Sequence, residues 1–405
     1  MNILFISEQM DTGGSQKEIL GLCKELQKLG HNLSIASNGG SLVASIRNAG
    51  LQHYGLPYRS GLRGYLPLAL LSLPYCLFRT IKIVKSKRID IVHAYTYLIP
   101  MAIASLACRI IRVPLVITLN DGIFDHPAKL SIIKSSNILK KAEKVIIISA
   151  EMRDLIRDLG HYANDQDKIV VIPNMVDLEE MDVSKDGTVV EEDVSAKHSS
   201  RILWASRLSP DKIKAIVNVV ESATAIIKRV PGARISIVGQ GSRYNQVLRL
   251  AEEVNRSIGD RAVIVTGFVK DISSMMRSSD VIVGMGKVVI EAMAFAKPVV
   301  VVGHITGRFG GNFGGVVTKE NVATHQAYNY SGRESRLIST PDRISEACIT
   351  LLTDREYSKM LGKFGREHVE QVHDSRKIGK QLERVYTDVF RGAHPNGDPW
   401  SPRSL

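Results

Sequence analysis

The sequence predicts an α/β protein made of two Rossmann-like, doubly wound parallel-sheet domains that face each other across a cleft. The chain has 405 residues, 44% of them hydrophobic and 23% charged, which is enough apolar material for two cores. Short runs rich in Val and Ile alternate with helical stretches in both halves, as in parallel sheets covered on both faces. A polar, acidic and aperiodic segment separates the two series.

The first series supplies the predicted N-terminal domain, residues 1–177. Its strands are expected at 2–7, 32–37, 89–95, 114–120, 144–149 and 168–173. Between the first two strands, apolar residues from Ile19 to Leu29 recur at helical spacing, and Gly30 ends that helix.

The second series follows a predicted linker at 178–200. Its strands are expected at 201–206, 234–240, 262–267, 280–284 and 298–303, and helices at 342–353, 355–372 and 376–391. We therefore predict a C-terminal domain at 201–375 and a final helix at 376–391 that crosses back to the N-terminal domain. The Pro-containing, aperiodic tail at 392–405 is predicted to be disordered.

Cysteine usage and the first residues bear on the compartment. Four scattered cysteines, Cys23, Cys76, Cys108 and Cys348, form no CxxC pair, which is typical of a reducing compartment without disulfides or a zinc site. The opening "MNILFIS" lacks the basic start and cleavage site of a signal peptide, and it predicts a strand. We therefore expect a cytoplasmic protein with no metal site.

The net charge of +12 is concentrated in the first half of the chain. Residues 47–144 carry 15 Lys and Arg against four Asp and Glu. The apolar run 65–78 is shorter than the roughly 18 residues that span a bilayer, and a cationic stretch ending at Arg88 follows it. This pattern suits an anionic membrane surface, although a core helix with a solvated basic end would also produce it. No nucleic-acid-binding motif accompanies the charge, so no nucleic acid partner is expected.

Two cations follow the first strand of the second series, in "SRLSPDK" (206–212). Arg207 offers a planar fork to phosphate oxygens, and Lys212 offers a mobile point charge. Because ligands of doubly wound sheets bind beyond the carboxyl ends of the strands, these cations predict a diphosphate site. The alternative is a pair of solvated loop cations.

Glycine-containing loops follow three of the predicted strands. In "GMGK" (284–287), Gly284 and Gly286 allow close backbone approach to an anion, and Glu291 is expected at the start of the following helix. "DTGGSQ" (11–16) and "VGQGSR" (238–243) are weaker signals, because tight turns need glycine anyway.

Other polar residues are ambiguous on their own. His93 ends a predicted strand, where its ring either reaches the cleft or is a satisfied structural group. The isolated pair Asp165 and Asp167 is better explained as a solvated loop than as a metal–nucleotide site.

Taken together and in order, these elements resemble the retaining glycosyltransferases of family 4, which have the GT-B fold. The likeness covers about residues 1–390 and rests on "DTGGS", "LGH", "DIVHA", "IPNMVDL", "SRLSPDK", "ISIVGQG", "TGFV" and "IEAMAFAKPVV". It implies a nucleotide-diphosphate-sugar donor on the C-terminal domain, an acceptor on the N-terminal domain, and no metal.

The resemblance also implies roles for particular residues. Arg207 and Lys212 would bind and stabilise the donor diphosphate, Glu291 would bind the donor ribose, and Gly14, with Gly13 beside it, would lie near the donor phosphates. The remaining donor-side candidates are Gly239, Gly284, Gly286 and Lys287. The acceptor-side candidates are His93, Asn120 and His126.

Two positions depart from the family pattern. Family members usually carry a sugar-contacting Glu eight positions before the one matched by Glu291, and this chain has Val283 there. They usually carry a His where this chain has Asn120, and His126 is a candidate replacement six residues later. The phosphate and ribose contacts are kept, so either the sugar is bound differently or catalysis is impaired.

We therefore expect a metal-independent retaining hexosyltransferase that uses a nucleotide-diphosphate sugar as substrate and a glycan or lipid-linked acceptor. Family precedent and the basic first domain favour cell-surface polysaccharide or envelope glycan synthesis, peripherally on the inner face of the cytoplasmic membrane. Two alternatives stay open. One is a catalytically impaired nucleotide-sugar-binding partner of an active transferase, and the other is a sugar-nucleotide epimerase.

Overall fold

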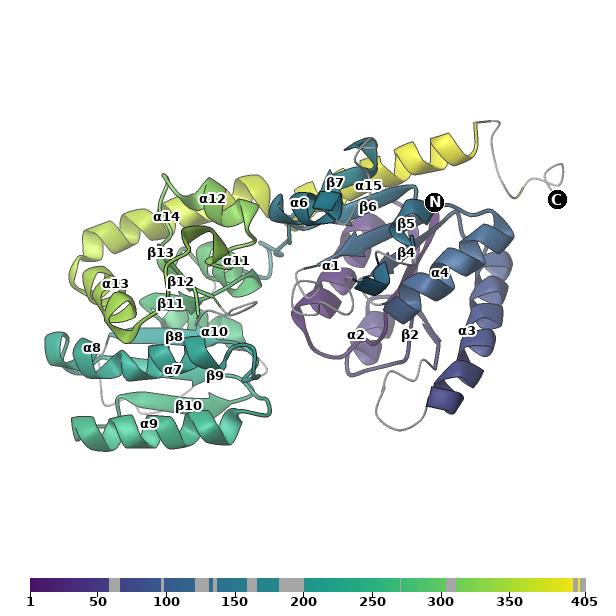
Figure 1. Cartoon of the computed structure of the whole chain (residues 1–405). Coiled ribbons are helices and arrows are strands. Elements are labelled where there is room, and N and C mark those ends of the chain that lie inside the picture. Colours follow the sequence, from purple (N-terminus) through teal and green to yellow (C-terminus); the bar gives the residue numbers. More distant parts are fainter. Residues whose placement is uncertain are drawn as a thin grey trace. The chain divides into compact units, whose positions relative to one another are not determined.

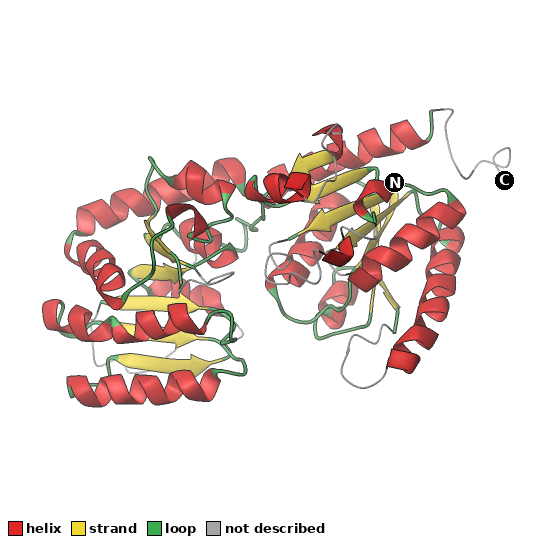
Figure 2. Ribbon diagram, in the orientation of Figure 1, coloured by secondary structure: helices red, strands yellow, loops and turns green. Residues whose placement is uncertain are grey.

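The computed structural model describes residues 1–57, 66–95, 98–120, 131–133, 137–158, 166–181, 200–269, 271–303, 311–395 and 400. The chain forms two compact α/β units (Figures 1 and 2). Unit 1 comprises Met1–Met175 and Ser375–Leu405, and unit 2 comprises Val176–Asp374. The chain therefore crosses between the units twice.

Unit 1 contains a parallel sheet with the order β3-β2-β1-β4-β5-β6-β7 among the described residues. The strands are β1 (Asn2–Ile6), β2 (Asn32–Ser37), β3 (Gln52–Gly55), β4 (Ile91–Tyr95), β5 (Leu115–Leu119), β6 (Lys144–Ile147) and β7 (Ile169–Val171). The edge strand β3 was not predicted from the sequence, because "QHYG" has neither the length nor the apolar character of the other strands.

Helices cover both faces of this sheet because successive side chains of each strand point to opposite sides. In β1, Ile3 and Phe5 pack into one apolar cluster with α1 (Gly14–Lys28) and α15 (Ser375–Ala393). Leu4 and Ile6 pack into another with α3 (Leu66–Ser86) and α4 (Leu98–Ile111). Two shorter helices, α2 (Val43–Asn48) and α6 (Glu151–Asp158), also belong to the described part of this unit.

The last helix extends slightly past its predicted end at 391. Helix α15 continues to Ala393, and Trp400 packs against the core of unit 1, because apolar rings gain by burial even in a Pro-rich segment. The other residues beyond 395 lie outside the described part of the chain.

Unit 2 contains a sheet with the order β10-β9-β8-β11-β12-β13 among the described residues. The strands are β8 (Arg201–Ala205), β9 (Arg234–Val238), β10 (Val263–Gly267), β11 (Val281–Gly284), β12 (Val299–Val302) and β13 (Phe313–Val316). All neighbours are parallel except β12 and β13, which pair antiparallel. The edge strand β13, "FGGV", was also missed by the sequence analysis, since two glycines weaken a strand pattern.

The helices of unit 2 also cover both faces of their sheet (Figure 2). They are α7 (Ile213–Glu221), α8 (Ala223–Arg229), α9 (Tyr244–Ile258), α10 (Ile272–Ser278), α11 (Lys287–Ala294), α12 (Val322–Ala327), α13 (Pro341–Thr353) and α14 (Arg355–Val372). The described part of the predicted linker belongs to this unit. Leu178 is in its core, and the Met181 carbonyl accepts a 2.9 Å hydrogen bond from Arg366. Residues 182–199 lie outside the described part of the chain.

The strand order places a topological switch point in each sheet. The order reverses between β1 and β4 in unit 1 and between β8 and β11 in unit 2. Loops on either side of such a point leave in opposite directions, so a crevice opens at the carboxyl ends of the strands. Candidate ligand residues should therefore be sought at these two edges.

Candidate functional site

Two loops interlock at the carboxyl edge of unit 2. The loop after β8 and the loop after β9 exchange backbone hydrogen bonds, from Leu208 N–H to the Gln240 carbonyl (3.0 Å) and from Arg243 N–H to the Leu208 carbonyl (2.9 Å). At Gly239, with φ +154°, a Cβ would lie 1.8 Å from the Ser206 carbonyl oxygen. Gly239 is therefore needed for the packing of these loops, whatever its role toward a ligand.

The predicted cations stand on the first of these loops. Arg207 is exposed, and Lys212 is half-buried at the residue that precedes α7. Because β8 and β11 are neighbouring parallel strands, the loops that follow them begin at the same carboxyl edge, on either side of the switch point. Arg207 and Lys212 are thus brought to the same edge as the "GMGK" loop.

The "GMGK" loop ends in a helix N-terminus at this edge. Gly284 is the last residue of β11, and Gly286, with φ +60°, immediately precedes α11. The first turn of α11 contains no acidic side chain, and Lys287 is its first residue. The N–H groups of a first helical turn that begins with Lys287, at the sheet edge that also carries Arg207 and Lys212, make a region suited to an anion.

The structure corrects the placement of Glu291. The sequence analysis expected this residue at the start of a helix, but α11 begins at Lys287, so Glu291 lies in its second turn. The β-branched run before Glu291 resembled an extended segment, whereas Gly286 sets the actual start of the helix. Because it lies beyond the first turn, Glu291 does not serve as a helix-start acid, and its side chain is half-buried.

The structure places Val283 in the core of unit 2. It is completely buried in β11, paired in register with Trp204 of β8 and Val300 of β12. Its side chain belongs to the same apolar cluster as both of them. Only Met285 and Gly286 separate β11 from α11. The position eight residues before Glu291 therefore lies within β11.

The carboxyl edge of unit 1 brings together two of the predicted elements. Gly13 precedes α1 and Gly14 is its first residue. Asn120 directly follows β5, and its side-chain N–H donates a 2.8 Å hydrogen bond to the Ser15 hydroxyl. A Cβ on Gly14 would meet no atom within 4 Å, so the space beside this turn is open.

His93 is a structural residue. Its ring is 1% exposed, with Nδ1 2.6 Å from the Tyr386 hydroxyl and Nε2 2.7 Å from the Thr118 hydroxyl. Burial lowers the pKa of His93 to about 3, so the ring is neutral and both nitrogens are satisfied within unit 1. It therefore cannot reach a ligand at the sheet edge, as one interpretation of the sequence required.

The structure says less about the remaining residues that the sequence suggested for ligand or metal binding. His126 and Asp165 lie outside the described residues, and Asp167 is in a short 3-10 helix. Within the described ranges, no group of His, Cys, Asp and Glu is arranged to hold a metal ion. The four cysteines are buried free thiols. Among the described helices, none combines the length and apolar character needed to cross a membrane.

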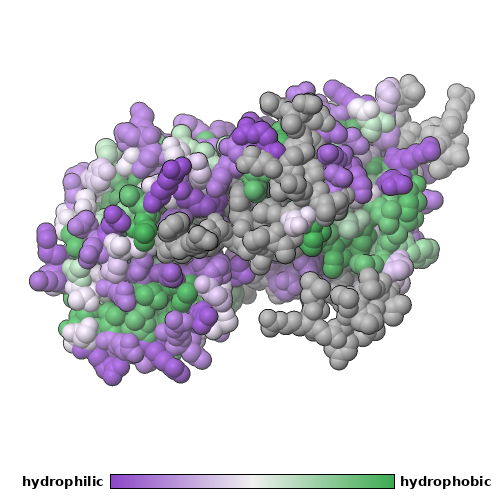
Figure 3. Space-filling model, in the orientation of Figure 1, coloured by the Kyte–Doolittle hydropathy of each residue, from purple (hydrophilic) through white to green (hydrophobic). Residues whose placement is uncertain are grey.

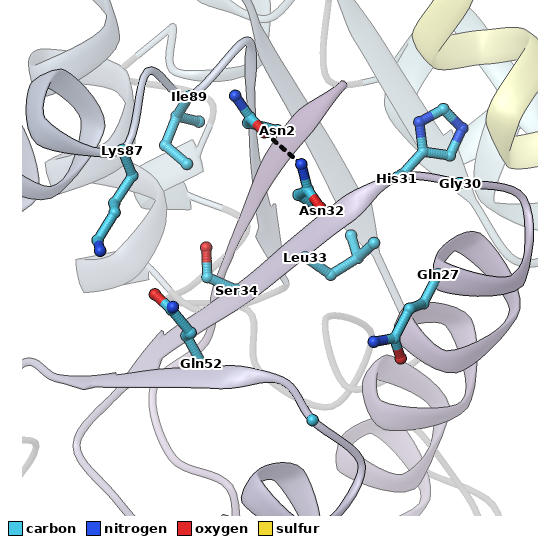
Figure 4. A pocket seen from close by; sticks show the side chains of 11 residues that line it. Asn2, Gln27, Gly30, His31, Asn32, Leu33, Ser34, Gln52, Lys87 and Ile89 are labelled. Atoms are coloured by element: carbon cyan, nitrogen blue, oxygen red, sulfur yellow. Dashed lines mark hydrogen bonds between the residues drawn. The ribbon is translucent and has the colours of Figure 1, made fainter.

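A polar pocket of about 400 Å³ opens at the opposite edge of unit 1 (Figure 4). It lies at the amino ends of β1 and β2, where Asn32 donates a 3.0 Å hydrogen bond to Asn2, and Lys87 also lines it. Nothing in the sequence pointed to it. Because it lies at the amino ends of the strands, it is not part of either carboxyl-edge region.

Each half of the chain matches the model of a glycosyltransferase family. Residues 12–180 match the model of Glycosyltransferase Family 4, and residues 199–354 match that of Glycosyl transferases group 1. The N-acetyl-alpha-D-glucosaminyl L-malate synthase of Bacillus anthracis is 26% identical over 325 residues, which covers 76% of this chain and 77% of that protein.

Solved structures share the fold over nearly the whole chain. A glycosyltransferase from Rickettsia africae superposes with a TM-score of 0.74 at 19% identity, covering 96% of this chain and 98% of that one. Anabaena HepE in complex with UDP-glucose gives a TM-score of 0.71 at 17% identity, covering 96% and 100%.

Proposed function

Because the chain belongs to the family 4 glycosyltransferases of the GT-B fold, we propose that it is a retaining hexosyltransferase that uses a nucleoside-diphosphate sugar. The observation that carries the proposal is the cationic carboxyl edge of unit 2, where the loop with Arg207 and Lys212 and the loop that begins α11 follow neighbouring strands. Anabaena HepE, which shares the fold, forms a complex with UDP-glucose, and this supports a nucleotide-sugar donor here.

The proposed chemistry needs charge stabilisation at one place. The bond between the sugar's anomeric carbon and the diphosphate oxygen breaks, and a bond to an acceptor hydroxyl oxygen forms on the same face. The departing diphosphate takes the proton of that hydroxyl. Arg207 and Lys212 stabilise the negative charge as it grows on the diphosphate, and the first-turn N–H groups of α11 contribute in the same direction.

The remaining roles follow from position. We propose that Glu291 accepts hydrogen bonds from the donor ribose and that Gly13 and Gly14 leave room for the donor phosphates. The acceptor, a glycan or a lipid-linked sugar, is assigned to unit 1, with Asn120 at its carboxyl edge. No step requires a metal ion in this scheme, so turnover should survive excess EDTA.

The exposed face of α3 and α4 suggests where the enzyme works. Phe78 is 66% exposed and Ile110 is 55% exposed, although both are large apolar side chains. Hydrophobic side chains gather over α4 and the adjoining part of α3 (Figure 3). Neither helix contains an acidic residue. The exposed cations Lys82 and Lys85 lie near the end of α3, and exposed Lys87 directly follows the helix. We propose peripheral docking on the anionic inner face of the cytoplasmic membrane, in cell-surface glycan synthesis.

Vesicle sedimentation tests the docking surface. The protein should sediment with anionic vesicles at low salt and be released as salt rises, because exposed charges are screened. Lys82→Gln with Lys85→Gln should weaken this binding, whereas the matched pair Lys359→Gln and Lys363→Gln, on α14, should not. Equal binding to anionic and zwitterionic vesicles would exclude electrostatic docking.

Calorimetric titration tests the donor site. Arg207→Ala and Lys212→Ala should each weaken UDP or GDP binding by about 1.5 to 3 kcal/mol, the range for hydrogen bonds to charged groups. Binding of uridine or guanosine should change little, and Lys214→Ala, an exposed cation on α7, is the matched control. Equal losses for nucleoside and diphosphate would contradict the assignment.

Turnover separates the alternatives. Nucleotide release with sugar transfer, across a panel of UDP- and GDP-sugars and acceptors that includes a small hydroxy acid, supports the transferase. Donor binding without turnover supports the catalytically impaired partner, motivated by Asn120. An isomerised donor supports an epimerase.

A further inference from the structure

A strained turn packs against the loop that begins α11. Asn329 and Tyr330 have φ of +50° and +51°, and Gly332 has φ +76°. Two consecutive non-glycine residues in the left-handed region are uncommon, and they persist only where the surrounding structure holds them. Local sequence preference therefore does not explain this turn, and its conformation has to be imposed by contacts.

The turn contacts the ends of two central strands. The Tyr330 carbonyl accepts a 3.0 Å hydrogen bond from Gly286 N–H, at the residue that precedes α11. A Cβ at Gly303, directly after β12, would lie 1.6 Å from the Ser331 carbonyl oxygen. The backbone of the turn thus supports the "GMGK" loop and packs so closely on Gly303 that no side chain fits there.

The Tyr330 side chain holds the turn in place. It is 1% exposed, and its hydroxyl lies 2.8 Å from His373 Nε2 and 3.1 Å from His368 Nε2. A phenol has one hydrogen to donate, so it donates to one imidazole and accepts the N–H of the other. Burial lowers the pKa of His368, which keeps that ring neutral and able to take either part.

The same contacts reach the residues where the chain leaves unit 2. The His373 carbonyl accepts a 2.9 Å hydrogen bond from Val176 N–H, and Val176 forms a parallel bridge with Asp374. Val176 and Asp374 are the first and last residues of unit 2. Tyr330 therefore connects the start of α11 to both crossing points of the chain.

We propose that Tyr330 is a positioning residue for the donor diphosphate. By fixing the turn, it fixes Gly286 and so directs the first N–H groups of α11 toward the anion. This proposal rests on the proposed function, which places the diphosphate at this helix start. Tyr330 itself does not touch the substrate, and its effect is exerted through the Gly286 backbone.

Removing the hydroxyl tests this role. Tyr330→Phe keeps the ring but removes the contact with both imidazoles. The Kd for UDP or GDP should rise about 2- to 13-fold, which corresponds to about 0.5 to 1.5 kcal/mol, the net magnitude of one hydrogen bond. The Kd for the nucleoside alone should stay within twofold. In turnover, the donor KM should rise while kcat changes less. Tyr328→Phe, the same change two residues away, should have no effect.

The outcomes distinguish this inference from the proposed function. If Arg207→Ala weakens diphosphate binding but Tyr330→Phe does not, the positioning role is wrong and the donor site stands. If neither variant affects diphosphate binding, the donor site itself is wrong. If Tyr330→Phe weakens nucleoside and diphosphate equally, the hydroxyl is only structural.

A second variant covers the case in which Tyr330→Phe does not fold. His368 is half-buried, so His368→Ala removes one partner of the hydroxyl without opening a cavity in the core. It should raise the Kd for the diphosphate in the same direction by a smaller factor, and His368→Gln, which keeps a hydrogen-bonding group, should recover part of the loss. No change for His368→Ala would overturn the proposal.

Discussion

The carboxyl edges of the two units share one topology but differ in charge and in backbone packing. In unit 2, the loops after β8 and β9 are locked together through Gly239, and the edge carries Arg207 and Lys212. In unit 1, the turn before α1 has open space beside Gly14 and a neutral Asn120 next to it. The comparison indicates that the fold supplies the crevice twice, while the loops decide which crevice suits a diphosphate.

The largest expected effect is a difference in stability between substitutions at Val283 and Asn120, the two positions that depart from the family pattern. Val283→Glu places a carboxylate in the apolar core of unit 2 and should lower its free energy of unfolding by about 3 to 5 kcal/mol, the cost of an uncompensated buried charge. Asn120→His in unit 1 loses one half-buried hydrogen bond and should cost about 1 kcal/mol.

Urea unfolding measures both changes. Circular dichroism follows the unfolding of both units, and in a Trp400→Phe background the fluorescence of Trp204, the remaining tryptophan, reports on unit 2 alone. A stable Val283→Glu protein with increased turnover would show that this position faces the ligand, contrary to its burial.

An intermediate difference in stability is expected between alanine substitutions of Gly239 in unit 2 and Gly14 in unit 1. Gly239→Ala forces a Cβ into the Ser206 carbonyl at a positive φ and should destabilise unit 2 by about 2 kcal/mol or more. Gly14→Ala meets no atom and should change stability by no more than about 0.5 kcal/mol. Similar melting temperatures for both variants would mean that the unit 2 loops are not locked as described.

The smallest effect per step is the pH dependence that His93 gives to the stability of unit 1. His93 has a folded-state pKa of about 3, against about 6.5 in the unfolded chain. Between these values the unfolded state binds a proton that the folded state does not. The free energy of unfolding should therefore fall by about 1.4 kcal/mol for each pH unit below 6.5, and be unaffected by His93 above it.

Urea unfolding at pH 7, 6 and 5 checks this slope. His93→Gln, which cannot titrate, should show a shallower dependence than the wild-type protein. An unchanged slope would mean that His93 is protonated in the folded state, against its burial.

The buried parallel strands could be predicted because Val and Ile runs such as 299–302 are apolar on both faces. The edge strands β3 and β13 could not, since their residues are polar or glycine and their pairing depends on neighbours. The cationic loop at Arg207 and Lys212 was evident from its position after a strand. The burial of Val283 was not, because a spacing does not reveal where a strand ends.

Tyr330 was also invisible to the sequence analysis, for a different reason. A non-glycine residue with positive φ carries no local signal, and its partners His368 and His373 are about 40 residues away. His93 is the opposite case. As a polar residue in a strand it suggested a functional role, and its burial excludes that role.

The return of α15 to unit 1 has a consequence for synthesis on the ribosome. Ile378, Leu382 and Tyr386 complete the core that α1 and β1 begin, yet they are translated after all of unit 2. Unit 2 is continuous and can fold as soon as it emerges, whereas the nascent unit 1 keeps an apolar face uncovered until α15 leaves the exit tunnel. Unit 1 is therefore the first unit to be synthesised and the last to complete its fold. A premature stop codon before α15 would leave its core exposed to binding by chaperones or cleavage by proteases.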